Sequence, residues 1–204
     1  MNLVRNLYDW VLKWSESKYG AVALFVMAFS EVSFFPIPPD VLLIALALGS
    51  RTKALKFGVI CSVGSIFGAM FGFGIGHYLW WGNVGQFSPL AQFFFNTIPG
   101  FTHNVFYSIQ NKFDIWNFWI IFTAGFTPIP FKVFTISAGA FNINFPLFII
   151  ASTISRTARF LIVSGLIGKF GEPISGFIDK YFNKLAILFT LLLIGGFLLI
   201  KYLV

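Results

Sequence analysis

The sequence predicts an all-α integral membrane protein that crosses the bilayer several times, and two observations support this prediction. Of 204 residues, 57% are hydrophobic and only 10% are charged, which gives a mean hydropathy of +0.83. A water-soluble domain of this length cannot bury so much apolar surface. Residues 57–81 also form 25 consecutive positions without Asp, Glu, Lys or Arg, enough for a helix to cross a hydrocarbon core about 30 Å thick.

The first elements are an interfacial helix and a broken helix. Residues 1–19 are predicted to lie on the membrane surface, because their apolar and charged side chains fall on different faces of a helix. Residues 20–49 hold two apolar arms, separated by a proline cluster that removes three backbone donors. Neither arm has the roughly 20 residues of a full crossing, so we expect a re-entrant hairpin that returns to its own side.

The next two elements are a span and a connector. The span 57–81 places glycine at every fourth position, which gives one smooth helical face for close packing of another helix. These glycines are Gly64, Gly68, Gly72 and Gly76. Residues 82–114 are rich in aromatic side chains and are predicted to form short helices in the membrane interface.

The second half repeats the pattern of the first, with a broken hairpin at 115–141 and a span at 145–168. At an offset of 92 and without gaps, the first half matches identical residues in the second half. The first-half members are Phe34, Pro36, Ile37, Pro38, Val41, Ile44, Leu55 and Gly76. Because each unit makes one net crossing, the two units must be inverted, a plan found in many transporters. An amphipathic cytoplasmic segment at 169–184 and a C-terminal span at 185–204 complete the prediction.

Lysine and arginine are distributed unequally between the two sides of this topology. Nine lie on the side of the N-terminal segment, 50–56 and 169–184, and only Lys112 and Lys201 lie on the other. The positive-inside rule therefore predicts a cytoplasmic N-terminus and a periplasmic C-terminus. The net charge of +7 is spread over connections and forms no stripe on a soluble domain, so nucleic acid is not an expected partner.

Five ionisable residues are predicted inside the membrane, where an unpaired charge is costly. They are Glu31, Asp40, Lys132, Arg156 and Arg159. Two negative and three positive charges suggest a shared polar pocket with one cation left over for an anion. Arg156 and Arg159 are three residues apart and share a helix face, where their forked donors suit a phosphate group, and a lipid phosphate is the anion expected at this depth.

The functional hypothesis for the carboxylates is proton coupling. Burial favours the protonated form of Glu31 or Asp40, whereas a neighbouring arginine favours the charged form, so a pair can exchange a proton as its geometry changes. The alternative is structural, with the arginines only neutralising the two carboxylates. The prolines are interpreted as hairpin formers; they are Pro36, Pro38, Pro39, Pro128 and Pro130.

Other chemistry has little support in the sequence. His77 fits an interfacial aromatic belt and His103 stands alone in a connection, so we expect neither a metal site nor a cofactor. The single cysteine, Cys61, excludes an intramolecular disulfide. Because no nucleophile triad or phosphate loop is present in the sequence, we do not expect an enzyme.

Three segments together resemble the DedA superfamily of SNARE-associated, VTT-domain membrane proteins, specifically its YqaA-like bacterial branch. They are EVSFFPIPPDVLL at 31–43, FTPIPFKVFTISAG at 126–139 and SRTARF at 155–160. The resemblance implies opposed re-entrant hairpins in the bacterial inner membrane. It also implies transfer of undecaprenyl phosphate or other phospholipids between leaflets, with dependence on the proton-motive force.

By the same likeness, Glu31 and Asp40 match the acidic hairpin positions of the superfamily, and Arg156 and Arg159 match the basic ones. Many relatives have Gly-Glu after the first hairpin's proline and Arg in the second hairpin. This chain has Pro39-Asp40 and Lys132 instead. Lysine offers a point charge where arginine offers a fork, so the identity of the lipid stays open.

The sequence as a whole predicts a proton-coupled flippase in which Arg156, Arg159 and Lys132 bind a lipid phosphate while Glu31 and Asp40 exchange protons. Its expected partners are anionic membrane lipids and protons, and association into a homo-oligomer is left open. Two alternatives also stay open. A small-ion or drug/proton antiporter would use the same carboxylates without needing paired arginines, and a membrane scaffold for envelope integrity would transport nothing.

Overall fold

The computed structural model describes residues 19–33, 38–82, 86–98, 101–127 and 130–171, and these residues are helical apart from short connections. The predicted interfacial helix at 1–19, apart from Tyr19, and the predicted segments at 172–184 and 185–204 lie outside the described residues. The helices are α2 (Gly20–Ser33), α3 (Asp40–Gly49), the 3-10 helix η1 (Arg51–Lys53), α4 (Ala54–Trp80), α5 (Pro89–Thr97), α6 (His103–Phe126), α7 (Phe131–Ala140) and α8 (Phe145–Phe170).

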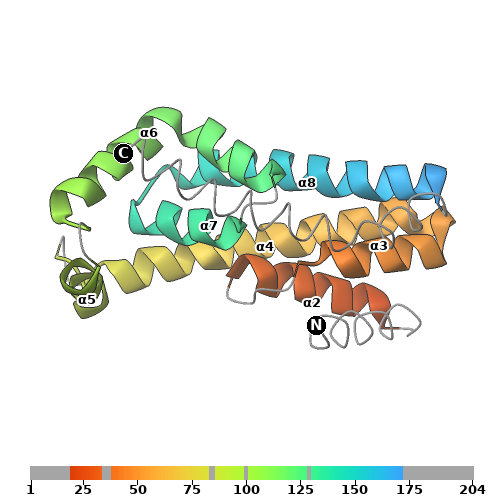
Figure 1. The fold of residues 1–204 in the computed structure, drawn as a ribbon, viewed down its shortest axis with the longest axis horizontal. Helices are drawn as coiled ribbons and strands as arrows, with labels where there is room; N and C mark the ends of the chain where they lie inside the picture. Colours follow the sequence, from red (N-terminus) through yellow and green to blue (C-terminus); the bar gives the residue numbers. More distant parts are fainter. Residues whose placement is uncertain (1–18, 34–37, 83–85, 99–100, 128–129, 172–204) are drawn as a thin grey trace.

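Helices α4 and α8 form the long central pair of the molecule (Figure 1). They run antiparallel, because Gly58 of α4 lies against Phe160 and Ser164 of α8, whereas Ala54 lies against Gly168. The segment Arg51–Trp80, with 30 residues, and Phe145–Phe170, with 26, are each long and apolar enough to cross a membrane. The predicted spans at 57–81 and 145–168 are therefore present as helices, with ends shifted by up to three residues.

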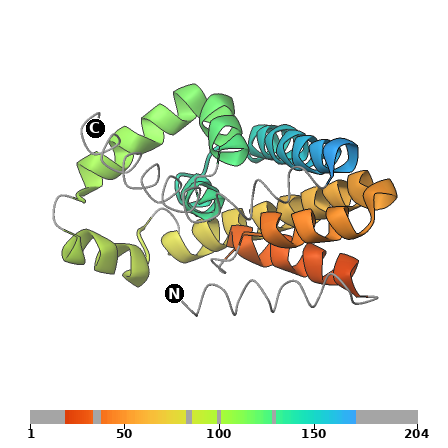
Figure 2. The ribbon, with the colours of Figure 1, turned by 45° about the vertical axis from the view of Figure 1, so that its right-hand side comes forward.

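The shorter helices form two helix–break–helix units at opposite ends of this pair (Figures 1 and 2). We call α2 with α3 the first hairpin, and the second half of α6 with α7 the second hairpin. Each is followed directly by a long helix, α4 or α8. The starts of α3 and α7 are 91 residues apart, as are the starts of α4 and α8, so the helix order recurs at nearly the offset found in the sequence.

The glycine face of α4 receives both hairpins. A Cβ atom added to Gly64 would lie 2.6 Å from the carbonyl oxygen of Phe25 in α2, and Gly68 meets the backbone of Phe29 in the same helix. Further along α4, Gly72 meets Thr135 of α7, and Gly76 meets the backbone of α7 at Ile136. These four glycines therefore lie where α2 and α7 approach α4 closely, and the stripe is divided between the two helices.

The connector between the two halves is an aromatic cluster at the end of α4. Trp80 stacks on Phe106 with ring centroids 5.5 Å apart, and the indole nitrogen of Trp81 donates to the carbonyl oxygen of Ala140 at 2.8 Å. Helix α6 runs through the predicted boundary at 114/115 without ending there. It bends instead at Trp116, whose backbone angles (φ −107°, ψ 16°) are not helical.

Candidate functional site

Two arginines occupy the middle of α8. The helix begins with a cap, in which the side chain of Asn144 accepts from the backbone of Leu147, and Pro146 fits its first turn. Arg156 and Arg159 follow about three turns later, on the side that faces the other helices. The side chain of Arg156 is 2% exposed and that of Arg159 is 18% exposed.

Arg156 is held on every side. Its Nη2 donates to Oε2 of Glu31 at 2.9 Å, and its Nε donates to the hydroxyl of Ser65 at 2.6 Å. The guanidinium carbon lies 4.7 Å from the ring centroid of Phe160 and 5.2 Å from that of Phe131. Buried ions need such paired and hydrogen-bonded surroundings. Contacts from α2, α4, α7 and α8 therefore converge on one guanidinium.

Arg159 connects the two hairpins. Its Nη2 donates to Oδ2 of Asp40, the first residue of α3, at 2.9 Å. Its Nη1 donates to the backbone carbonyl of Thr127, which follows the last residue of α6, at 2.8 Å. One side chain on α8 thus binds the start of an arm in the first hairpin and the end of an arm in the second.

A third contact joins the hairpins directly. The hydroxyl of Thr135 in α7 lies 3.3 Å from the carbonyl oxygen of Val32 in α2 and 3.0 Å from that of Lys132. It can donate to either oxygen. Thr135 is fully buried. The broken ends of both hairpins therefore meet beside the midpoints of α4 and α8.

The predicted meeting of acidic and basic residues from the two halves is present, but its members are not equivalent. Glu31 pairs with Arg156 and Asp40 with Arg159, so each carboxylate has its own arginine. Lys132, at the start of α7, is half-buried and makes no ion pair within the described ranges. Of the five ionisable residues predicted inside the membrane, Lys132 is therefore the cation without a carboxylate partner among the described residues.

Three of the five predicted hairpin-forming prolines lie among the described residues. Pro39 is buried and precedes the first residue of α3, and Pro130 precedes the first residue of α7. Pro38 is exposed. Pro36 and Pro128 lie outside the described residues.

Three residues of the site were not predicted from the sequence. Ser65 sits beside Gly64 in the glycine-patterned span, and a polar residue next to a packing stripe is the signal that could have identified it. Thr135 had a similar signal, since it lies one turn from Lys132 on α7. Thr127 acts through its backbone carbonyl, and no side-chain pattern predicts that contact.

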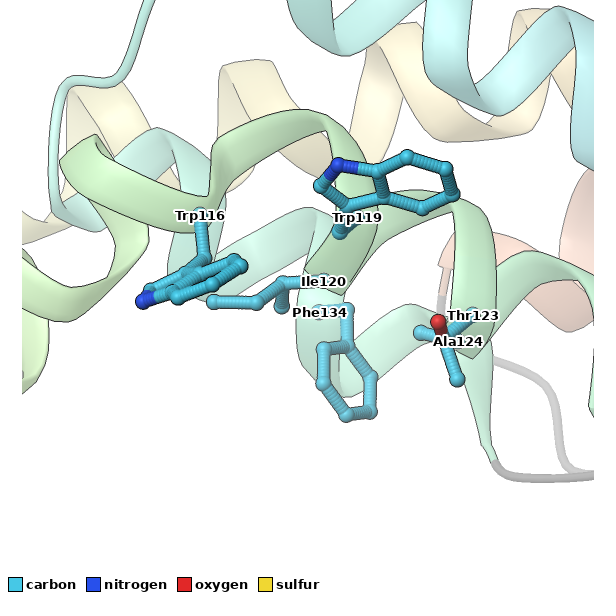
Figure 3. A pocket seen from close by; sticks show the side chains of 6 residues that line it. All are labelled: Trp116, Trp119, Ile120, Thr123, Ala124 and Phe134. Carbon is cyan, nitrogen blue, oxygen red and sulfur yellow. The ribbon is translucent and has the colours of Figure 1, made fainter.

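An apolar groove lies on the second hairpin, away from the ion pairs. It has a volume of about 360 Å³ and is open to the surroundings. Trp116, Trp119, Ile120, Thr123 and Ala124 of α6 line it together with Phe134 of α7, and Figure 3 shows these side chains around the depression. Thr123 is its one side chain with a hydroxyl, so the groove fits a hydrocarbon chain better than a polar ligand.

Potential metal ligands do not gather in the part of the chain that the structure describes. No group of three or more His, Cys, Asp or Glu side chains comes together there. His77 stacks on Phe73, and His103 packs against Phe87 and Phe95 in the aromatic cluster. Cys61 is buried and free.

Comparison with known proteins gives relatives without functional names. No family model matches the chain, and no solved structure matches it. An uncharacterised protein of Haemophilus influenzae is 33% identical over 182 residues, 88% of each chain. An uncharacterised protein of Histophilus somni is 30% identical over 81% of this chain and 82% of its own. An uncharacterised protein of Methanocaldococcus jannaschii is 30% identical over 69% of this chain and 79% of its own.

Proposed function

We propose one function for this chain and for the family to which it belongs, that of the uncharacterised Haemophilus influenzae and Histophilus somni proteins. The function is transfer of a phosphate-bearing lipid between the leaflets of the bacterial cytoplasmic membrane, coupled to protons. The observation that supports it is the pair of buried ion pairs, Glu31–Arg156 and Asp40–Arg159, at the point where the two broken hairpins meet. A polytopic membrane protein has little reason to keep four charges at this depth unless they act.

The helix lengths support placement in a bilayer. At 1.5 Å per residue, α4 and α8 are about 40 Å long, whereas α3 and α7 are only about 15 Å long. The long pair spans a hydrocarbon core of about 30 Å, and the hairpins enter it from opposite sides and return. Arg51, Lys53 and Lys56 lie at the same end of the long pair as Lys169, so this end faces the cytoplasm.

The two ion pairs have different roles in this mechanism. Asp40–Arg159 is the more open pair, with exposed fractions of 22% and 18%, so a lipid phosphate reaches it first. The phosphate takes the place of the Asp40 carboxylate on Arg159, and Lys132 supplies the second positive charge. Glu31 then takes up or releases a proton as its contact with the enclosed Arg156 changes. Because Arg159 binds both hairpins, this exchange releases one hairpin from the other.

The lipid assignment has two supports. Lys132, without an ion pair among the described residues, can neutralise a phosphate, and the apolar groove of the second hairpin can hold a hydrocarbon chain on the same hairpin. An amphiphile with a phosphate head fits both features. The resemblance to the DedA superfamily points to the same class of substrate.

The proposal is tested by reconstituting the purified protein in vesicles of phosphatidylethanolamine and phosphatidylglycerol with a trace of fluorescently labelled phosphatidylglycerol. Dithionite bleaches the label in the outer leaflet, so continued bleaching measures transfer between leaflets. We expect transfer above that of protein-free vesicles. Arg159→Gln should reduce it about tenfold or more, because a charge-assisted bond to phosphate is lost. Lys169→Gln, which removes a cation from the end of the same helix, should leave it unchanged.

Three results would contradict this proposal. Equal bleaching with and without the wild-type protein, repeated with labelled polyprenyl phosphate, would favour a scaffold. Uptake of a soluble cation against a proton gradient, without lipid transfer, would favour an antiporter. A loss of transfer in Lys169→Gln equal to that in Arg159→Gln would show that the central position of the charge is irrelevant.

A further inference from the structure

Two buried polar side chains, one on α6 and one on α8, have atoms without hydrogen-bond partners. They are Asn117, 5% exposed, and Ser152, which is not exposed. The side-chain oxygen of Asn117 and the hydroxyl of Ser152 make no hydrogen bond to any described residue. Native structures pair nearly all such groups with protein or with ordered water, so these two positions indicate a bound ligand that is small and polar.

Helix geometry places the two side chains at successive heights on one side of the Glu31–Arg156 pair. Ser152 is one helical turn before Arg156 on the same face of α8, a step of about 6 Å along the axis. Gly125 of α6 lies against Ser155 of α8, and α6 and α8 run in the same direction (Figure 1). Asn117 therefore lies about 7 Å beyond Ser152, further from Arg156. Each step can be bridged by one or two waters, since hydrogen-bonded oxygens are about 2.8 Å apart.

The unpartnered atoms gather on one side of the ion pairs. Within the described ranges there are four, and the other two are the imidazole Nδ1 of His77 and the indole nitrogen of Trp80, near the end of α4. All four lie on the α5 side of Arg156. On the other side of Arg156, the buried hydroxyls of Ser62 and Ser164 donate to backbone carbonyls of their own helices.

The backbone also favours solvation near Asn117. Trp116, the residue before it, has the non-helical angles that bend α6. A local break in a helix frees backbone groups that water can bind, and such breaks are frequent at functional positions. Asn117 therefore has a donor, an acceptor and an interrupted backbone in one place.

We propose that Asn117 and Ser152 bind a short file of water that conducts protons between the α5 end of the molecule and Glu31. This inference rests on the proposed function, because it supplies the proton for its coupling step. Water passes a proton along the file to the Glu31 carboxylate, and the Glu31–Arg156 contact loosens. After the hairpins separate, the neutral acid releases the proton toward the opposite, cytoplasmic end. In the orientation proposed above, the file opens toward the periplasm.

The residues that face this route set its selectivity. Apart from Glu31, the charged groups around its inner end are Arg156, Asp40 and Arg159, with the thiol of Cys61 also buried nearby. A net positive guanidinium beside the file disfavours metal cations. Phe148 and Ala151, next to Ser152 on α8, belong to the buried apolar core.

The test compares two serines of the same helix. Ser152→Ala removes an unpartnered hydroxyl, and Ser164→Ala removes a buried hydroxyl that has a partner on the far side of Arg156. Each variant is reconstituted in the vesicles described above with pyranine inside, and a pH step outside starts proton entry. We expect Ser152→Ala to slow proton entry about tenfold, the effect of one lost hydrogen bond on a rate, and Ser164→Ala to leave it unchanged. Asn117→Leu, of similar volume, should slow it as well.

The thermal stability of Ser152→Ala distinguishes a role of Ser152 in proton conduction from a structural role. Because the Ser152 hydroxyl bonds to no protein group, Ser152→Ala should change the thermal unfolding temperature little while proton entry falls. Normal proton entry in both Ser152→Ala and Asn117→Leu would overturn the water file. Wild-type lipid transfer without proton entry would also overturn it, and would leave lipid transfer standing without its proton coupling. Proton entry that depends on Ser152, without lipid transfer, would support the file and contradict lipid transport.

Discussion

The first hairpin brings two carboxylates to the centre of the molecule, whereas the second brings a backbone carbonyl and a lysine, although both pack on the same face of α4. The packing is shared: Gly64 and Gly68 receive α2, and Gly72 and Gly76 receive α7. The charges are not shared. At the offset of 92, Asp40 corresponds to Lys132, a residue of opposite sign.

The same contrast holds for the other charged residues. Glu31 corresponds to Thr123, and Arg156 corresponds to Gly64. Arg159 corresponds to Phe67. Every residue of the two ion pairs therefore stands where the repeat is broken. The charges of the site therefore distinguish the two halves, whereas both hairpins pack on the same long helix.

The largest effect is expected from breaking the enclosed ion pair. Arg156→Met leaves the Glu31 carboxylate buried without its partner, and we expect it to lower the free energy of unfolding by about 3–5 kcal/mol. Arg159→Met should cost less, because Asp40 and Arg159 are both partly exposed. Unfolding of the purified protein by titration with SDS in mixed micelles measures both.

A double variant shows how much of the lost stability comes from burying the Glu31 carboxylate without Arg156. Glu31→Leu combined with Arg156→Met removes both ions, and most of the lost stability should return. If the double variant is as unstable as the sum of the single variants, the two side chains do not interact. The contrast between charge and packing would then be wrong.

An intermediate effect is expected at the shared glycine face. In Gly76→Ala, the added Cβ would lie 2.8 Å from the backbone carbon of Ile136 and 2.9 Å from the nitrogen of Ala140, and neither atom can move without shifting α7. We expect a loss of about 1–3 kcal/mol. Gly74→Ala is the matched control: nothing lies within 4 Å of its added Cβ, so it should stabilise α4 slightly.

Temperature-dependent tryptophan fluorescence in detergent can rank these two variants against the wild type. Equal unfolding temperatures for Gly76→Ala and Gly74→Ala would mean that α7 does not approach α4 as closely as the structure shows. The second hairpin would then differ from the first in packing as well as in charge.

Much of the arrangement follows from the sequence because helix length and glycine spacing are local properties. The uncharged run at 57–81 and the four-residue glycine period predicted α4 and its packing face, and the offset of 92 predicted the recurrence of α3 and α4 as α7 and α8. The clustering of Glu31, Asp40, Arg156 and Arg159 followed from the cost of isolated charges.

The sequence did not predict which carboxylate pairs with which arginine, because the pairing depends on how helices from distant parts of the chain align. Nothing in the sequence distinguishes Glu31–Arg156 from Glu31–Arg159. The enclosure of Arg156 between Phe131 of α7 and Phe160 of its own helix likewise depends on how α7 packs against α8. The hydrogen bond from Arg159 to the backbone carbonyl of Thr127 cannot be predicted from side-chain types, because every residue has a carbonyl.

The smallest effect is expected where the hairpins touch each other without charge. Thr135→Val keeps the shape of the side chain but removes the hydroxyl that lies 3.3 Å from the Val32 carbonyl and 3.0 Å from that of Lys132. We expect a loss of about 1 kcal/mol, the usual contribution of one hydrogen bond. Ser137→Ala, two residues along α7, is the control, because no hydrogen bond of its side chain contributes to the contact between hairpins.

Amide hydrogen exchange can locate that loss. If Thr135 joins the hairpins, Thr135→Val should speed exchange at the ends of α2 and α7 together, while α4 and α8 keep their protection. Faster exchange in α7 alone would mean that the Thr135 hydroxyl donates only to the Lys132 carbonyl and not to the Val32 carbonyl. Arg159 would then be the only remaining polar connection between the hairpins among the described residues, and Arg159→Met should separate their exchange rates.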